Sequence, residues 1–497
     1  MGQTVVRGGL VLDIAGGTAE PIDIVIDGDT ISEMGPPGIG APEGAIVIDA
    51  TRRLIHPGLV NAHTHSHGNL GKGMGDLWTL ELLLGAAPML TGYRGLEDFR
   101  LSAQIGAIEM MLKGCTACYD LFVEWPIPTR EGIGAVALAY AELGMRAVIA
   151  PMVADRTFYE AIPGLADAVP DALRDKVAAL RLAPGAATVA AIRAAFDAWP
   201  ADREMVRPAV APTIPHHCSD EFILGCAGLA RDFAVGLHSH VGESKVQAVA
   251  SRKVYGKTQT AHLDELGVLG PQFTVAHGVW LDPDDMARLG DHGASVAHNP
   301  GSNMRLGSGL ADTRTMLERR VNLGIGTDGA NCADNQNMYE AMRLASFVSK
   351  VQGPEWQRWL TTREAALAAT EGSARALGFD KIGRIAPGWK ADLVFLDLDH
   401  PNWLPLNNPV NQLVHAEDGS AVDKVMIGGR LVVENRKPVG VDMTRLAAQA
   451  EAARERLFAA NADNRALYAA LEPVIGSYCP GLARMPYHVH RYGAHVG

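Results

Sequence analysis

The sequence predicts an α/β protein: a (β/α)8 TIM-type barrel with a small β-sandwich domain built from both ends of the barrel domain. Three observations support this fold. Eight short apolar stretches alternate with helix-like stretches in the middle of the chain, strand-like segments with tight turns stand at both ends, and no glycine-rich phosphate turn follows the first middle strand. Eight strands alternating with helices suit a closed parallel barrel, and an open doubly wound sheet is the alternative.

Strand-like segments at the two ends of the chain predict the β-sandwich. They show alternating apolar residues and Gly or Asp-Gly turns, which are typical of β-hairpins. These segments are residues 4–13, 23–35, 45–55, 392–399 and 421–438. Two β-rich segments far apart in sequence can pair when the ends of the domain between them lie close together. We therefore predict one composite domain from residues 1–57 and 385–442.

The middle of the chain, residues 58–384, is the predicted barrel and would bind a metal. Its strand-like stretches are GLVNAHTH, TACYDLF, RAVIAPM, VRPAVAPT, VGLHSHV, FTVAHGV, ASVAHNP and NLGIGTD. Helical spacing separates them, as in the set Leu101, Ile105, Ile108 and Leu112. Ser219 is suited to cap the helix that begins DEFILGC.

Residues 443–497 are predicted to form a C-terminal helical extension and tail. The first part is rich in alanine, and the tail carries an H-x-H pair, His488 and His490. Large Ala-rich helices at the surface could bury a subunit interface. We therefore expect a homodimer or a higher homo-oligomer.

Composition narrows the possible partners. The chain of 497 residues has a formal net charge of −12 and no long basic run, which argues against nucleic-acid binding. It has no window of about 18 uncharged apolar residues, so we expect no membrane partner.

Cysteine usage and the start of the chain indicate the compartment. Six cysteines in so long a chain form no disulfide framework, and the C-x-x-C of Cys115 and Cys118 is interpreted as packing at the start of a buried strand. The first residues lack a basic patch followed by a long apolar stretch. We expect a cytoplasmic protein.

Histidines and acids cluster at the ends of the predicted barrel strands. His63 and His65 stand two apart at the end of the first strand, where their side chains point to the same side. The fifth strand carries a second such pair that ends at His240, with Glu243 three residues later, and the eighth ends near Asp328. Imidazoles on rigid strands suit a zinc-type ion, and active sites lie at the carboxyl ends of barrel strands.

These motifs give the sequence a resemblance to a known family. PGLVNAHTH, HVGE, VAHGV, AHNPGSNMRLGSG, GIGTDG and IGRIAPGWKADLVFLD resemble the amidohydrolase superfamily, above all its cytosine deaminase and triazine chlorohydrolase-like branch. The resemblance runs from about residue 4 to residue 441. It implies a mononuclear site whose ligands match His63, His65, His240 and Asp328. It further implies that Glu243 is the acid/base carboxylate and that His277 contacts the attacking water and the substrate.

The fourth strand bears on the number of metal ions. Thr213 and the loop after Asp328, which reads Asn331, Cys332, Ala333 and Asp334, depart from the family pattern and bear on the substrate. Binuclear members carry a carboxylated lysine on the fourth strand, whereas VRPAVAPT has no lysine, which favours one metal. Relatives that deaminate adenosine-type nucleosides often have histidine where this chain has Thr213, in APTIPHHCS, which argues against a nucleoside.

The resemblance implies a metal-dependent hydrolase acting on a C–N bond. We expect hydrolytic deamination of an amino-substituted N-heterocycle (pyrimidine, purine or triazine-like) by hydroxide on the metal, with catalysis by Glu243, His277 and Asp328. The expected cofactor is one divalent ion, zinc in preference to iron or manganese. The alternatives are another leaving group (chloride, an alkylamine or an opened cyclic amide) and a non-catalytic barrel protein.

Five further residues are candidates for contacts with the small heterocyclic substrate. A tryptophan after the first strand could stack on a planar ring, an arginine could meet an anion, and two histidines and an asparagine could line the pocket. These candidates are Trp78, Arg156, His217, His298 and Asn303.

Overall fold

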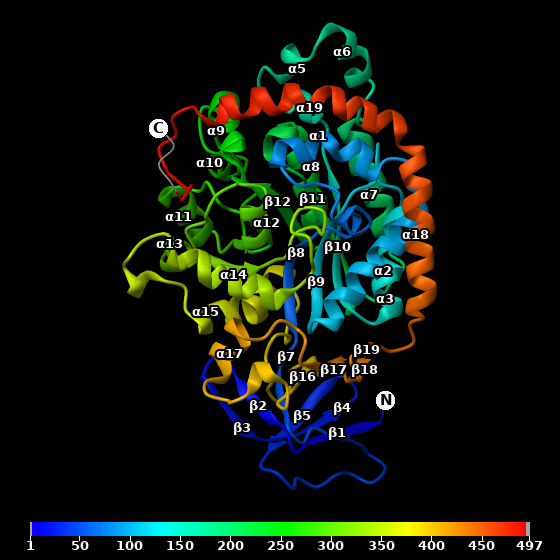
Figure 1. The fold of residues 1–497 in the computed structure, drawn as a ribbon, viewed down its shortest axis with the longest axis vertical. Helices are drawn as coiled ribbons and strands as arrows, with labels where there is room; N and C mark the ends of the chain where they lie inside the picture. Colours follow the sequence, from blue (N-terminus) through cyan, green and yellow to red (C-terminus); the bar gives the residue numbers. More distant parts are fainter. Residues whose placement is uncertain (1, 494–497) are drawn as a thin grey trace.

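The computed structural model describes residues 2–493, and eight parallel strands form its centre (Figure 1). The strands are β8 (Leu59–Thr64), β9 (Cys115–Phe122), β10 (Arg146–Val153), β11 (Val206–Pro212), β12 (Gly236–Val241), β13 (Phe273–His277), β14 (Ser295–His298) and β15 (Asn322–Ile325). Each coincides with a predicted strand. Their residues are almost all buried, because helices cover the outside and side chains fill the inside.

The strands close into a barrel. Each pairs with its neighbours in chain order from β8 to β15. Between the two ends of this order, the Asp328 N–H donates to the carbonyl of His63 (2.9 Å) and the Thr327 N–H donates to Asn61 Oδ1 (3.1 Å). The prediction of a barrel in place of an open sheet is confirmed.

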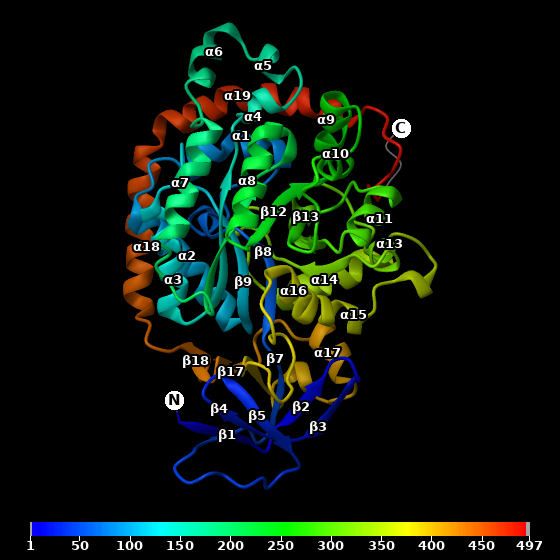
Figure 2. The same cartoon turned by 180° about the vertical axis from the view of Figure 1, so that it is seen from behind.

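Helices surround the barrel and connect its strands (Figures 1 and 2). They are α1 (Leu80–Thr91), α2 (Leu96–Leu112), α3 (Arg130–Leu143), α7 (Gly185–Asp197), α8 (Asp220–Asp232), α9 (Lys245–Tyr255), α10 (Gln259–Glu265), α11 (Pro283–Asp291), α12 (Pro300–Arg305), α13 (Thr313–Glu318), α14 (Met338–Lys350), α15 (Thr362–Leu367), α16 (Ser373–Leu377) and α17 (Pro409–His415). Short 3-10 turns are η1 (Ser66–Gly71), η2 (Pro215–His217), η3 (Trp356–Arg358) and η5 (Pro401–Trp403), and η4 (Ala368–Gly372) is a π-turn. The predicted cap of α8 is confirmed, since Ser219 Oγ accepts from the Phe222 N–H at 3.2 Å.

Two further sheets lie at one end of the barrel. One has the order β5 (Thr30–Gly35), β4 (Asp23–Asp27), β1 (Gln3–Arg7) and β6 (Ile46–Asp49). The other has the order β19 (Lys437–Pro438), β18 (Arg430–Glu434), β17 (Val422–Ile427), β16 (Leu393–Asp397), β7 (Arg53–Pro57), β2 (Leu10–Asp13) and β3 (Thr18–Pro21). Because β16 pairs antiparallel with β7, the second sheet joins both ends of the chain. The domain limits near residues 57 and 385 stay a prediction.

A buried ion pair connects the barrel to the seven-stranded sheet. Arg146 begins β10, and its Nε lies 2.9 Å from Asp392 Oδ2, beside the start of β16. Both side chains are at most 3% exposed. Asp392 also accepts from the Gly428 N–H (2.7 Å), so the pair holds the turn between β17 and β18 as well.

Two segments cover the opposite end of the barrel. One is the connection from β10 to β11, with α4 (Phe158–Ala161), α5 (Leu165–Ala168) and α6 (Asp171–Ala178). The other is α19 (Ala462–Ala483), which lies across this end above α1 in both ribbon views, whereas α18 (Met443–Ala460) runs along the side of the barrel beside α2 (Figures 1 and 2). Leu471 and Ile475 of α19 share one hydrophobic cluster with Tyr159 and Leu165. This end of the molecule is therefore packed from three parts of the chain.

The tail after α19 docks on the loop that follows β13. His488 Nε2 lies 2.7 Å from Asp282 Oδ2, and Arg491 Nη2 donates to the carbonyl of Leu281 at 2.7 Å. The Leu310 N–H donates to the carbonyl of Arg491 (2.8 Å). The last part of the predicted tail, residues 494–497, lies outside the described residues.

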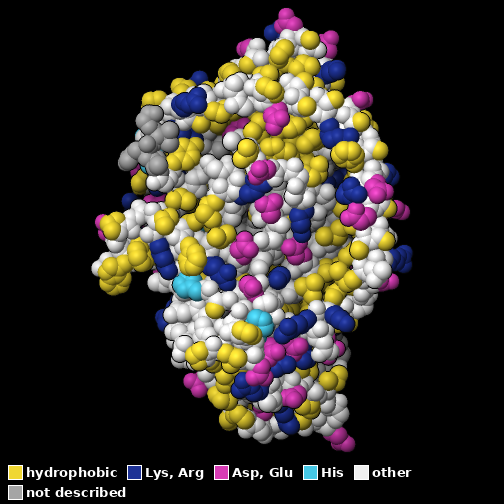
Figure 3. All heavy atoms as spheres, viewed as in Figure 1, with side chains coloured by type: hydrophobic (Ala, Val, Ile, Leu, Met, Phe, Trp, Pro, Cys, Tyr) yellow, Lys and Arg dark blue, Asp and Glu magenta, His cyan; other side chains and the backbone are white. Residues whose placement is uncertain are grey.

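Charges of both signs lie on the surface, and the cysteines lie inside the protein. Acidic and basic side chains are intermixed on the face seen in Figure 3. All six cysteines are buried free thiols, Cys115 and Cys118 of β9 included. Within residues 2–493, none of the helices combines the length and the apolarity needed to cross a membrane.

Candidate metal centre and active site

Six chemically active side chains meet at the carboxyl ends of four barrel strands. His63 lies in β8 and His65 directly follows it, while His240 lies in β12, His277 ends β13 and Asp328 follows β15. Glu243 comes three residues after His240, just before α9. All six are less than 9% exposed. Strands that are far apart in sequence thus bring the predicted metal and catalytic residues together.

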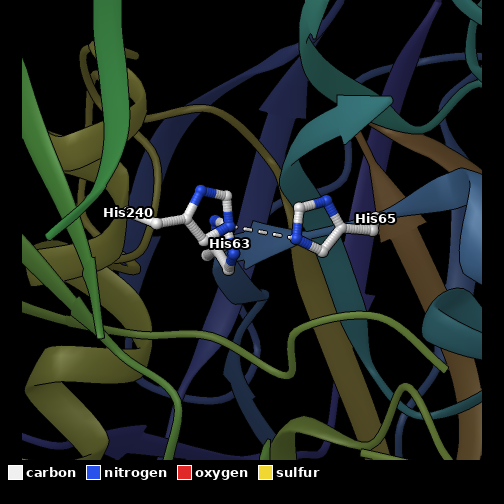
Figure 4. Close-up of side chains that lie close together, drawn as sticks. All are labelled: His63, His65 and His240. Atoms are coloured by element: carbon white, nitrogen blue, oxygen red, sulfur yellow. Dashed lines mark hydrogen bonds between the residues drawn. The ribbon is translucent and has the colours of Figure 1, made fainter. Parts of the chain in front are cut away.

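Three histidines and a carboxylate form the centre of this group. His65 Nε2 lies 3.3 Å from His240 Nε2, and His63 stands beside both rings (Figure 4). Asp328 Oδ1 lies 3.2 Å from His65 Nε2 and 3.6 Å from His63 Nε2. One ligand atom from each of the three histidines falls within 4.8 Å of the others. The spacing suits four side chains that share one central atom.

Backbone carbonyls fix two of the rings in one tautomer. His65 Nδ1 donates to the carbonyl of Leu121 (2.6 Å), and His240 Nδ1 donates to the carbonyl of Thr213 (2.8 Å). A nitrogen that faces a carbonyl carries the proton, so Nε2 of each ring presents a lone pair to the centre. This is the form in which imidazole binds a metal.

The donor set fits a divalent metal. His63 is 0% exposed, and among the described residues neither of its ring nitrogens has a hydrogen-bond partner. Buried polar atoms are normally satisfied, so an ion at this point would supply the missing partner. Three imidazole nitrogens and one carboxylate oxygen are a ligand set that zinc accepts.

Burial and mutual interactions also set the protonation states that ligands need. Burial lowers the pKa of His63 to about 3, so its ring is neutral. Burial would raise the pKa of Asp328, but the neighbouring rings of His63 and His65 outweigh it and hold this pKa well below its usual range. A neutral imidazole and an ionised carboxylate at neutral pH are both ready to coordinate a cation.

Glu243 has the electrostatics of a proton carrier. Its Oε2 lies 3.7 Å from His277 Nε2 and accepts from Gln247 Nε2 at 3.4 Å. Burial raises the pKa of Glu243 well above its ordinary value, and the charges of Asp328 and Glu81 raise it further. A carboxyl group with a raised pKa can hold a proton near neutral pH and deliver it.

His277 and Asp328 both sit on strained backbone. Their φ angles are +71° and +64°, in the left-handed region that residues with a side chain rarely adopt. Such conformations cost on the order of 1–3 kcal/mol and persist where the surrounding structure imposes them. His277 Nε2 and Asp328 Oδ2 lie 3.7 Å apart, so the two strained residues converge on one point.

A cavity of about 320 Å³ opens above these residues. His65, His240, Glu243, His277 and Asp328 line its inner end. Side chains from α1, from the loops after β9 and β10, and from the segment 180–182 line the outer part. The size and the convergent polar groups are those of a small-molecule site.

Of the five residues predicted to contact the substrate, two line the cavity and three do not. Arg156 and His217 line the cavity. Trp78 does not line it, because its ring packs edge-on against Tyr468 of α19 at 6.0 Å. His298 is buried outside the cavity lining, and neither of its ring nitrogens has a partner among the described residues.

Asn303 contacts the site indirectly. Its Oδ1 accepts from His277 Nδ1 at 2.9 Å, and Asn303 itself does not line the cavity. An amide oxygen only accepts, so His277 carries its proton on Nδ1 and presents Nε2 toward Glu243 and Asp328. Asn303 therefore orients a predicted catalytic side chain.

The sequence analysis missed the apolar side chains of the cavity wall. Prominent among them are Leu84, Trp125, Met152, Phe158 and Leu182. They lie on α1, β10, α4 and loops, and no chemical motif marks them in the sequence. Asn331 and Cys332, in the loop after Asp328, line the cavity too, although this loop departs from the family pattern.

A parallel barrel with histidine and carboxylate ligands at its strand ends, and an acid beside them, defines a metal-dependent hydrolase. The chain belongs to the amidohydrolase family, whose model matches residues 54–432. It is therefore an enzyme of a family that acts on C–N bonds other than peptide bonds, with a divalent metal as cofactor.

Similar sequences include named deaminases. A 5'-deoxyadenosine deaminase of Methanothermobacter thermautotrophicus is 32% identical over 394 residues, covering 78% of this chain and 84% of the relative. A 5-methylthioadenosine/S-adenosylhomocysteine deaminase of Thermoanaerobacter pseudethanolicus is 29% identical, covering 86% and 92%.

Similar solved structures include zinc complexes. An adenosine deaminase from Xanthomonas campestris with bound zinc has a TM-score of 0.81 at 25% identity, covering 91% of this chain and 98% of its own. An atrazine chlorohydrolase from Arthrobacter aurescens TC1 complexed with zinc has the same TM-score at 26% identity, covering 91% and 100%.

Proposed function

We propose that the protein is a hydrolytic deaminase of an amino-substituted N-heterocycle that uses one zinc ion. One observation carries the proposal: His63 is fully buried and its ring nitrogens have no hydrogen-bond partner among the described residues. Beside it, His65 and His240 present lone pairs and Asp328 is ionised, while the acid Glu243 lines the same cavity. His63, His65, His240 and Asp328 would hold the ion. When bound, zinc supplies Lewis-acid activation of water and of the substrate.

The side chains divide the proton transfers between them. Asp328 Oδ2 lies 3.7 Å from His277 Nε2. The attacking water lies between these two atoms and gives a proton to Asp328. Water oxygen bonds to the ring carbon that bears the amino group. Glu243 delivers a proton to the adjacent ring nitrogen, so the negative charge that develops there is neutralised.

His277 positions the water by accepting a hydrogen bond from it at Nε2, because Asn303 anchors its Nδ1. The bond from carbon to the amino group then breaks. The amino group leaves as ammonia with the proton that Asp328 took from water, the proton of the new hydroxyl group returns to Glu243, and a ring carbonyl remains.

A second function uses the same site with another leaving group. The likeness to an atrazine chlorohydrolase at a TM-score of 0.81 favours chloride in particular. Here the carbon–chlorine bond breaks in place of the carbon–nitrogen bond, and the leaving chloride needs no proton.

We also propose that the protein is a cytoplasmic homo-oligomer. Six unpaired thiols are typical of a reducing compartment. In α18, a helix of 18 residues, Ala453 is the one buried residue, so most of this helix is available to a second copy.

Product analysis tests the proposed function. Zinc-loaded protein is incubated with amino-substituted pyrimidines, purines and triazines, and with the chloro analogue of each ring, while ammonia and chloride are measured. Ammonia release supports deamination, whereas chloride release alone favours the second function. Release of neither ammonia nor chloride from any ring compound, with zinc bound to the protein, would overturn both proposed functions.

A substitution tests the role of the acid. Glu243→Gln keeps the shape of the side chain but removes the proton carrier, so we expect kcat to fall by roughly 10²–10⁴-fold with zinc still bound. Asp328→Asn, which removes a ligand as well, serves as the blank. Loss of zinc from Glu243→Gln would contradict the role given to Glu243.

A further inference from the structure

The outer part of the cavity differs in chemistry from its inner end. Leu84 of α1, Trp125 after β9, and Phe158 of α4 are three of the apolar side chains that face it. They come from three separate segments of the chain. A bare heterocycle bound at Glu243 would leave this outer part filled with water against an apolar wall.

Most polar side chains of the outer part have hydrogen-bond partners within the protein, and Tyr159 Oη, which has none among the described residues, is buried beneath the cavity surface. Thr91 Oγ1 donates to the carbonyl of Ala87 (2.8 Å) and accepts from Trp125 Nε1 (3.1 Å). Thr157 Oγ1 donates to Glu160 Oε2 at 2.9 Å. Substrate hydroxyls in this region would lose water and find these groups engaged, which is unfavourable.

Asn464 of α19 is engaged in the same way. It reaches the outer part of the cavity, and its Nδ2 donates to the carbonyl of Pro88 (3.0 Å) and to Asn461 Oδ1 (2.8 Å). The two arginines of the lining, Arg156 and Arg181, keep contact with solvent and so do not require a partner in the substrate.

The inner end, by contrast, has polar atoms to offer. Glu243, His277 and Asp328 line it, and His217 and Asn331 belong to the same lining. They can bind the edge of a polar ring. The cavity is therefore polar where the ring would react and apolar where a substituent would extend.

We propose that the substrate carries an uncharged apolar substituent, such as a short alkyl group, on the aminoheterocycle. The substituent lies against Leu84, Trp125 and Phe158, and a hydroxylated group such as a sugar is disfavoured. This inference rests on the proposed function for the ring. It separates the chain from relatives whose names specify an adenosine-type substrate.

A matched pair of substituents tests the inference. A propyl and a 2,3-dihydroxypropyl group have the same carbon chain and differ in two hydroxyls. Each is placed on adenine and on triaminotriazine, which keep the same leaving group. We expect kcat/KM to be roughly 10- to 100-fold higher for the propyl compound, because the wall favours apolar surface and leaves hydroxyls unpaired.

Substitution of a wall residue tests whether the apolar wall causes the preference for propyl. Leu84→Asn should reduce the preference for propyl by about tenfold, through KM with kcat nearly unchanged, since binding of a remote group is equal in ground and transition states. Leu224→Asn, the same change at an exposed helix position on α8, is the control and should keep the preference.

A binding measurement separates this inference from the proposed function. The same two substituents on rings without the amino group cannot be deaminated, and calorimetry gives their Kd. Tighter binding of propyl, with a more negative heat-capacity change, supports the inference even if no amine is released from any ring. Equal binding, tighter binding of the diol, or failure of both compounds to bind would overturn it.

Discussion

At the residue scale, His277 depends on one amide for its orientation. Asn303 Oδ1 accepts from its Nδ1, whereas Nε2 of the ring has no hydrogen-bond partner among the described residues. Partners of this kind fix the tautomer of a functional histidine, and their loss commonly costs 10- to 100-fold.

Replacement of Asn303 tests this dependence. We expect Asn303→Ala to lower kcat by roughly 10- to 100-fold while zinc content and KM change little. Asn322→Ala is a suitable control, because Asn322 is hydrogen-bonded to Ser295 and Gly372 away from the cavity. A variant with wild-type kcat would show that His277 needs no such support.

The reacting residues could be predicted from the sequence, but the apolar wall could not. His63, His65, His240 and Asp328 stand in strand-end motifs whose spacing fixes the direction of each side chain. A wall residue such as Phe158 lies on an inserted helix, and its place depends on tertiary packing alone. Trp78 and His298 also stand near motifs, yet packing turns both away from the cavity.

At the element scale, the Arg146–Asp392 pair holds the barrel and the seven-stranded sheet together. Both charges are out of water, so each depends on the other. Removal of one partner from such a pair leaves an uncompensated buried charge, which is strongly destabilising.

We expect Asp392→Ala to lower the free energy of unfolding by about 3–5 kcal/mol. Denaturant unfolding followed by circular dichroism measures the change. Asp399→Ala removes the partner of Arg52 in an exposed pair and should lower the free energy of unfolding much less. Similar losses in the two variants would contradict the importance given to burial.

Element order could be predicted well, since each barrel strand is a short apolar run with a helix after it. The docking of α19 on α1 could not be predicted. Gly85 of α1 makes room for Ile475, since a Cβ on Gly85 would lie 2.4 Å from the Ile475 Cδ1. Nothing in the spacing of either helix identifies the other as its partner.

At the scale of the whole molecule, the metal centre links three strands of the barrel. β8, β12 and the segment after β15 meet there, so an ion bound to the folded chain stabilises the entire ring of strands. Without an ion, Asp328 remains buried beside three histidines.

Removal of the ion should therefore lower the thermal unfolding midpoint. An ion at 100 times its Kd contributes about 2.7 kcal/mol. We expect the chelator-treated protein to unfold at a lower temperature and to recover its midpoint when zinc is returned. His240→Asn, which lacks a ligand, should respond much less to the chelator. Equal responses in both proteins would place the ion elsewhere.

The seven-stranded sheet also constrains the order of events during synthesis. β7 leaves the ribosome with Pro57 at its end, whereas its partner β16 begins only at Leu393. At about 5–20 residues per second, roughly 20–70 s separate the two strands. Throughout that interval the nascent amino-terminal strands present an open edge, so the first segment to be made is among the last to complete its sheet and the one most in need of a chaperone.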